Sequence, residues 1–323
     1  MCGIVAVTGY KKALPLLLNG LEKLEYRGYD SAGIAIIDSV TNNIACNKTE
    51  GKLKNLINNI NDKKIPGTVG IGHTRWATHG KPEVKNAHPH IDSSGTVAVV
   101  QNGIIENYKD LKNKLEKEGT IFNSDTDTEV IPHLIQRELN TLSKLKLENN
   151  GSTLLVAVRN VISDLEGSYA LAVLWSGAPT SLVVARRQAP LIIGLGEGEF
   201  ICASDTPAIA NFTNIILPLE DEEIALLTPL GIEIYDSNNE RQYRNPVSLK
   251  VSEQVIDKKN FKHFMLKEIY DQPGTARNWL KNYLIKNRDN GQFHINYPFD
   301  TNFFDAIERI EIIACGTSKH AAM

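Results

Sequence analysis

A cysteine directly follows the first methionine, and this position points to nucleophilic chemistry. If Met1 is removed, which a small residue at position 2 permits, Cys2 carries a free α-amine and a thiol on one residue. The amine has an ordinary pKa of about 7.7–8.0 and could accept the thiol proton directly or through a water molecule. The apolar stretch that follows Cys2 is long enough for a buried strand, and the alternative is that Cys2 is a small buried thiol where this strand starts.

A thiolate that attacks an amide also needs hydrogen-bond donors for the oxyanion that forms. Asn102 and Gly103 are candidates, because they follow an expected buried strand over 97–100 and can supply a side-chain amide and a backbone N–H. The alternative is that Asn-Gly is an ordinary turn dipeptide.

Two further residues could hold the charged ends of an amino acid. Arg75 could bind a carboxylate through two hydrogen bonds, and Asp127 could accept hydrogen bonds from an ammonium group. Taken singly, Arg75 fits a surface ion pair and Asp127 fits a helix N-cap. Together with a nucleophile at Cys2, the pair predicts an amino-acid substrate.

Four histidines within a short stretch suggest a metal site as an alternative. These are His73, His79, His88 and His90. Their spacing matches no established set of metal ligands, so polar histidines in loops are favoured and no metal is predicted.

The elements that must position these residues are runs of strands that alternate with helices along the chain. Helices are expected over 13–24, 52–60, 108–118, 128–139 and 154–165. Strands are expected over 34–37, 44–46, 68–73, 97–100, 169–175, 182–185, 200–203, 224–227 and 232–235. Sequential strands with helices in pairs between them predict an α+β fold with antiparallel sheets.

The C-terminal part predicts a separate region. Residues 237–259 are polar and contain the expected domain boundary. Helices are expected over 261–269 and 276–285, with a break at Pro273. A strand over 310–314 is expected to lead into a Gly-Thr-Ser turn and a helix N-terminus, which could form a phosphate site. The alternative is a tight strand-to-helix turn with no ligand.

Composition excludes several classes of protein. The 323 residues are 42% hydrophobic and 23% charged with a net charge of −3, which indicates no nucleic-acid or membrane partner. No apolar run is long enough to span a bilayer, and no signal peptide is expected. The four widely spaced cysteines fit a reducing compartment, so a cytoplasmic location is predicted.

Several motifs occur in the order found in one enzyme family. The chain resembles the isomerizing glutamine–fructose-6-phosphate aminotransferases in the following segments: Cys2 to Val5, Tyr26 to Gly33, His73 to Gly80, Asn86 to His90, Asn102 to Asn107, Thr126 to Glu129, Phe264 to Pro273 and Ala314 to Ser318. The resemblance covers the whole chain.

The resemblance implies a class II glutamine amidotransferase domain of the N-terminal nucleophile type over 1–236, folded as a four-layer αββα sandwich. It also implies interdomain helices over 237–304 and a truncated α/β sugar-isomerase domain over 305–323. Glutamine and, in full-length relatives, fructose 6-phosphate are the implied substrates. No cofactor is implied, and full-length relatives are expected to be homodimers.

The resemblance also assigns site residues. It makes Cys2 the nucleophile with its α-amine as base, Asn102 and Gly103 the oxyanion hole, and Arg75 and Asp127 the ligands of the glutamine α-carboxylate and α-amino group. The remaining implied residues surround the substrates: Thr78 and His79 on a closing loop, Trp76 at an ammonia gate, and Thr317 and Ser318 at the sugar phosphate.

Two departures from the family pattern limit what is expected. The family commonly has His where Gln101 stands, which bears on the orientation of Asn102. The sequence stops at Met323, so glutamine hydrolysis is the most that this chain is expected to perform. The alternatives are another class II enzyme, such as an amidophosphoribosyltransferase, or an inactive remnant or regulatory module.

Overall fold

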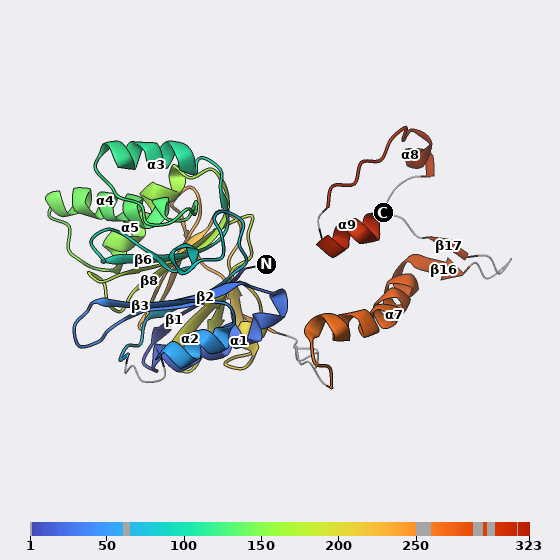
Figure 1. The fold of residues 1–323 in the computed structure, drawn as a ribbon, viewed down its shortest axis with the longest axis horizontal. Helices are drawn as coiled ribbons and strands as arrows, with labels where there is room; N and C mark the ends of the chain where they lie inside the picture. The colour runs from blue at the N-terminus through green and yellow to red at the C-terminus, as the bar shows by residue number, and fades with distance from the viewer. Residues whose placement is uncertain (1, 61–64, 250–259, 287–292, 296–300, 315) are drawn as a thin grey trace. The chain divides into compact units, whose positions relative to one another are not determined.

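The computed structural model describes residues 2–60, 65–249, 260–286, 293–295, 301–314 and 316–323 (Figure 1). The chain forms two compact units, Met1–Asp257 and Lys258–Met323. Both the oxyanion candidates and the candidate amino-acid ligands belong to the first unit. The domain limits expected at 236 and 304 stay predictions.

Two antiparallel sheets form the centre of the first unit. The eight-stranded sheet has the order β15-β11-β9-β10-β1-β4-β2-β3. Its strands are β1 Gly3–Gly9, β2 Ser31–Ile37, β3 Ile44–Glu50, β4 Gly70–Arg75, β9 Ile192–Leu195, β10 Glu199–Ala203, β11 Ile215–Pro218 and β15 Val247–Ser248.

The second sheet has seven strands in the order β14-β13-β12-β8-β7-β6-β5. They are β5 His90–Ile91, β6 Val97–Ile105, β7 Gly167–Trp175, β8 Leu182–Arg187, β12 Ile224–Thr228, β13 Gly231–Tyr235 and β14 Arg241–Gln242. Neighbouring strands are antiparallel in both sheets, which confirms the predicted α+β class.

Helices cover the outer faces of the two sheets. Figure 1 shows α1 and α2 on one side of the sheets, and α3, α4 and α5 on the other. The helices of this unit are α1 Ala13–Lys23, α2 Leu53–Ile60, α3 Tyr108–Lys117, α4 Val130–Lys144, α5 Gly151–Ser163 and α6 Pro207–Ala210, with 3-10 turns at Glu25–Arg27 and Val84–Asn86.

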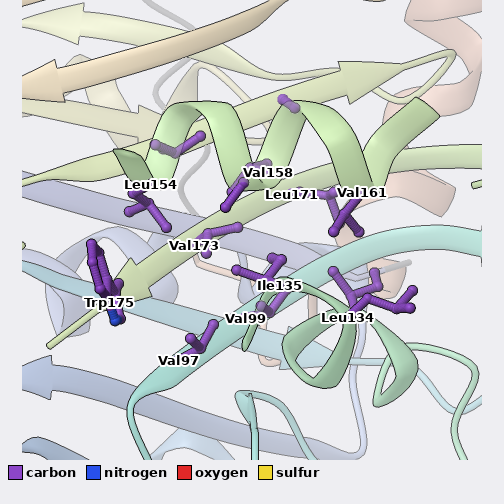
Figure 2. Packing of buried hydrophobic residues seen from close by; sticks show 14 of the residues in the cluster. Val97, Val99, Leu134, Ile135, Leu154, Val158, Val161, Leu171, Val173 and Trp175 are labelled. Carbon is purple, nitrogen blue, oxygen red and sulfur yellow. The ribbon is translucent and has the colours of Figure 1, made fainter. Parts of the chain in front are cut away.

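Three buried clusters correspond to the three interfaces of this αββα sandwich. One lies between the two sheets and includes Ile4 and Val100. Another joins α1 and α2 to the larger sheet, and the third joins α3, α4 and α5 to the smaller one. Figure 2 shows this third interface, where Val158 of α5 faces Leu171 and Val173 of β7.

Strand β1 holds the centre of the larger sheet. All seven of its residues are buried, and it pairs with β4 on one side and β10 on the other. Cys2 directly precedes this strand. Because Gly3 pairs with Thr74 of β4, Cys2 is placed beside the residues that follow β4.

The second unit differs from the prediction in two places. Helix α7, Phe264–Tyr283, is continuous, with Pro273 inside it, whereas two helices separated at this proline were predicted. A proline removes one backbone donor, and strong helix formers on either side can continue the helix past it.

Residues 310–314 were predicted as a strand, but they form none. A strand needs a hydrogen-bonded neighbour, and among the described residues of this unit only β16 Leu284–Lys286 and β17 Phe293–Ile295 pair.

Two short helices complete the second unit, α8 Thr301–Asp305 and α9 Gly316–Ala322. Within the described ranges, no helix is both long and apolar enough to cross a membrane.

Candidate active site

The thiol of Cys2 contacts the residue that follows β4. The backbone N–H of Trp76 donates to Cys2 Sγ at 3.3 Å, and Sγ lies 3.6 Å from the Trp76 carbonyl oxygen. Burial raises the pKa of the Cys2 thiol, while the Trp76 N–H and the nearby Arg75 guanidinium oppose that rise. A thiol in this setting needs a base to become a nucleophile.

The backbone carbonyl of Cys2 is fixed from two directions. Arg27 Nη1 donates to it at 3.0 Å, and Asn102 Nδ2 donates to it at 3.3 Å. Arg27 is itself paired with Asp205 at 2.7 Å. The sequence alone assigns no role to Arg27, although Tyr26 to Gly33 is one of the segments that carry the family resemblance.

The two predicted oxyanion donors lie at this point as well. Asn102 and Gly103 are neighbours in β6, and the Asn102 amide faces the backbone of the nucleophile. Gly103 has a φ of +111°, and a Cβ there would lie 2.1 Å from the Ser168 carbonyl oxygen. Only glycine can occupy this position, because any side chain would displace β7.

Arg75 ends β4 and is 4% exposed. Its guanidinium donates to the carbonyl oxygens of His79, Gly80 and Lys81, so the loop after β4 folds back over it. A buried guanidinium with five donors in a fixed plane suits a carboxylate. The interpretation of Arg75 as a surface ion-pair member is wrong.

Asp30 holds the start of this loop. Its carboxylate accepts from the backbone N–H of Ala77 at 2.6 Å, and its own N–H donates to the Arg75 carbonyl at 2.8 Å. Local sequence patterns do not single out this aspartate, because its partner Ala77 is 47 residues away.

Asp127 is 4% exposed and lies near the same loop. Its Oδ2 accepts from the backbone N–H of Ile105 at 2.8 Å, and its Oδ1 lies 3.8 Å from His79 Nδ1. Burial raises the pKa of this carboxyl, and the Ile105 N–H, His79 and Arg75 oppose the rise. The carboxylate therefore does not cap α4, whose N-cap is Glu129.

The other predicted residues are placed less closely. Trp76 is 53% exposed, and its ring lies beside Gly28, where a Cβ would be 3.3 Å away. Thr78 is exposed on the same loop. Ser318 is exposed on α9, and the side chain of Thr317 lies outside the described residues. Both belong to the second unit, so their role at a sugar phosphate stays a prediction.

Three of the histidines form a buried stack beside β6. His73 and His88 are stacked at 4.2 Å, and His88 meets His90 edge to face at 4.7 Å. Burial lowers the pKa of His73 and of His90 to about 3 and that of His88 well below its usual value. In the part of the chain that the structure describes, no group of three or more histidine, cysteine or acidic side chains is placed to hold a metal ion.

Gln101 uses its side chain away from Asn102. Its Oε1 accepts from Thr128 Oγ1 at 2.5 Å, and its backbone N–H donates to His88 Nδ1 at 3.2 Å. The contact with His73 is made by the Gln101 backbone carbonyl instead. The side chain at position 101 therefore does not touch the oxyanion candidate.

We expect Gln101→His to leave the kcat for glutamine hydrolysis within about threefold of the original, since a backbone carbonyl is kept whatever the side chain. Initial rates of glutamate release measure this. Gln101→Leu, which leaves the Thr128 hydroxyl without this acceptor, should cost about 1 kcal/mol of stability but change kcat little. A hundredfold loss in both variants would show that the side chain orients Asn102.

The first unit matches a known domain family. Residues 73–211 match the model described as "Glutamine amidotransferase domain". Over its whole length the chain is 50% identical to the glutamine–fructose-6-phosphate aminotransferase (isomerizing) of Thermosynechococcus vestitus and 51% identical to that of Nostoc sp.. In both cases 100% of this chain aligns with 51% of the relative. The chain thus spans about half the length of these relatives.

Solved structures give the same fold. A glutamine phosphoribosylpyrophosphate amidotransferase from B. subtilis, complexed with ADP and GMP, superposes with a TM-score of 0.60 at 29% identity, covering 76% of this chain and 50% of that one. A structure described as the allosteric regulatory enzyme of purine biosynthesis has a TM-score of 0.63 at 23% identity, covering 95% of this chain and 70% of that one.

Proposed function

Since the chain carries a domain of the glutamine amidotransferase family, we propose that it hydrolyses the side-chain amide of glutamine to glutamate and ammonia through a thioester on Cys2. One observation carries the proposal most directly. The pairing of β1 with β4 sets Cys2 beside the loop that follows Arg75, and the Asn102 amide reaches the same cysteine.

The proposed reaction begins with proton transfer from the Cys2 thiol to the Cys2 α-amine, which is free once Met1 is removed. The thiolate attacks the amide carbon of glutamine, and the negative oxygen is met by Asn102 Nδ2 and the Gly103 N–H. The intermediate collapses as the ammonium returns its proton to the leaving nitrogen, which departs as ammonia. Water, deprotonated by the same amine, then attacks the thioester, releases glutamate and restores the thiol.

Substrate orientation follows from two buried charges of opposite sign. Arg75 would exchange the carbonyl oxygens of the loop for the α-carboxylate of glutamine, and Asp127 would accept from the α-ammonium group. Recognition of both ends selects a free amino acid over a peptide-bound glutamine.

Beyond glutamine hydrolysis, we propose that the chain contributes to the reaction named for its relatives, in which the nitrogen reaches fructose 6-phosphate. The support is the identity of about half of all residues over the entire chain. In that setting Trp76 would lie at the ammonia gate and Thr317 and Ser318 at the sugar phosphate. A cytoplasmic homodimer is the state expected for the full-length enzyme.

The amidophosphoribosyltransferase alternative is less well supported. The similarity to that structure is 29% over 76% of this chain, against 50% over the whole chain for the isomerizing aminotransferase. A regulatory or inactive module is the remaining alternative. Retention of Met1 together with no release of glutamate from a folded sample would favour it, because a blocked Cys2 has no free α-amine.

The substrate-binding assignment has a matched test. We expect Asp127→Asn to raise the KM for glutamine about 10–100-fold with a smaller effect on kcat, because a charged hydrogen bond worth about 1.5–3 kcal/mol is lost. Glutamate release over a range of glutamine concentrations measures it. Asp125→Asn is the control, since Asp125 is exposed and paired with Lys85 at the surface, and it should leave KM unchanged. An unchanged KM in Asp127→Asn would remove Asp127 from the binding site.

A further inference from the structure

The orientation of the Asn102 amide is set by one buried ring. We propose that His73 is a positioning residue for hydrolysis: its Nε2–H turns the Asn102 side chain so that Nδ2 faces Cys2 and the oxyanion. This inference rests on the proposed function for its effect on catalysis, and on hydrogen-bond geometry alone for the orientation itself.

The proton on His73 is located by its two neighbours. Nε2 lies 3.0 Å from the Gln101 backbone oxygen and 3.0 Å from Asn102 Oδ1. A backbone carbonyl can only accept, so Nε2 must carry the hydrogen. A ring N–H must in turn face an acceptor, which identifies the nearby Asn102 atom as the oxygen of the amide.

The other end of the amide is then determined. Nδ2 points toward Cys2, where one of its hydrogens is donated to the Cys2 carbonyl at 3.3 Å. An amide nitrogen carries two hydrogens, so the second remains for an oxyanion on the substrate. A reversed amide would place N–H against N–H at His73 and an oxygen lone pair against the developing negative charge.

The ring cannot easily change its state. His73 is fully buried and stacked against His88 at 4.2 Å, and among the residues that the structure describes its Nδ1 has no hydrogen-bond partner. His88 is fixed in turn, because its Nδ1 accepts from the Gln101 N–H and its Nε2 faces Thr128 Oγ1 at 3.4 Å. Burial keeps the pKa of His73 near 3, so the neutral ring is present at every pH at which the enzyme would work.

The test compares two substitutions that differ in the donor. His73→Leu removes it, and we expect kcat for glutamine hydrolysis to fall about 10²–10³-fold, the usual loss for one oxyanion donor, with KM changed less than about threefold. His73→Gln can place an amide N–H near the same position and should recover at least about tenfold of that loss. Alkylation of Cys2 by iodoacetamide needs no oxyanion hole, so its rate in His73→Leu should stay within about threefold of the original.

A matched control is His133→Leu, which also removes a buried histidine. His133 contacts Phe122 and Ser93 rather than Asn102, so kcat should be retained. A parallel loss of kcat, glutamine affinity and alkylation rate in His73→Leu would indicate general damage to the site and overturn the inference. Failure of His73→Gln to exceed His73→Leu would do the same.

The orientation can be tested without activity. In the unsubstituted protein, nitrogen-15 NMR spectra between pH 5 and 8 should show that the His73 ring is protonated on Nε2 and unprotonated on Nδ1. A proton on Nδ1 would overturn the inference even if glutamine is hydrolysed. If no glutamate is released but the Nε2 proton is found, the proposed function fails while the orienting contact stands.

Discussion

Replacing Cys2 by alanine is expected to lower the kcat for glutamate release by about 10⁴–10⁶-fold, the range seen when the nucleophile of a covalent mechanism is removed. Neither of the other two thiols that the structure describes can substitute, because Cys46 lies in β3 and Cys202 is completely buried in β10. Oxyanion stabilisation and substrate binding alone would remain. The measurement is glutamate release from purified protein whose N-terminal residue has been identified by mass spectrometry.

Cys46→Ala provides the control for this prediction. It also removes a thiol, in edge strand β3 of the same sheet, and should keep the original rate. Loss of activity in both variants would point to a folding defect. Retention of more than about 1% of the rate in Cys2→Ala would rule out the thioester mechanism.

Acid is expected to destabilise the first unit from about pH 6.5 downward. Burial keeps His73, His88 and His90 neutral in the folded protein. It lowers the pKa of His73 and of His90 from the usual 6.5 to about 3, and it lowers the pKa of His88 well below 6.5. Between these values the unfolded chain binds protons that the folded chain excludes, so the free energy of unfolding falls as pH falls. Each histidine contributes up to about 1.4 kcal/mol per pH unit, or about 4 kcal/mol per unit for all three, and this full slope is reached about one unit below pH 6.5.

Urea unfolding between pH 5 and 7 measures this slope, above the range where ordinary carboxyl groups titrate. His90→Gln removes one of the three titrating groups but can still reach its partner Thr126, which lies 3.1 Å from His90 Nε2. The slope should then fall by about a third. A free energy of unfolding that does not change over this pH range would show that the histidines are hydrated and titrate normally.

The arrangement of the first unit follows from local patterns. The spacing of Leu14, Leu17 and Leu21 predicts α1, and the apolar run that begins at Gly3 predicts β1; both elements are present. Such patterns record which face of an element is buried. They failed in the second unit, where α7 continues past Pro273 and residues 310–314 form no strand. A strand depends on a neighbour that the local sequence cannot specify.

Only part of the candidate site could be predicted from the sequence. The sequence suggested a nucleophile at Cys2 and donors at Asn102 and Gly103, and the structure places these residues together. It did not single out Arg27 or Asp30, because their contacts come from the tertiary fold: Arg27 reaches Asp205 and Asp30 reaches Ala77. Nor could spacing show that the histidine suspected as a metal ligand at position 73 contacts the Asn102 amide.

The central position of β1 has a consequence for synthesis of the protein. Val5 pairs with Ala203 of β10, so one edge of this strand has no partner until that residue has left the ribosome. At about 5–20 residues per second, the delay is on the order of 10–40 s. During this time the apolar strand can bind a chaperone, and a peptidase can remove Met1 as the proposed mechanism requires. Slower translation between residues 10 and 199 should therefore lengthen the period available for N-terminal processing without altering the folded enzyme.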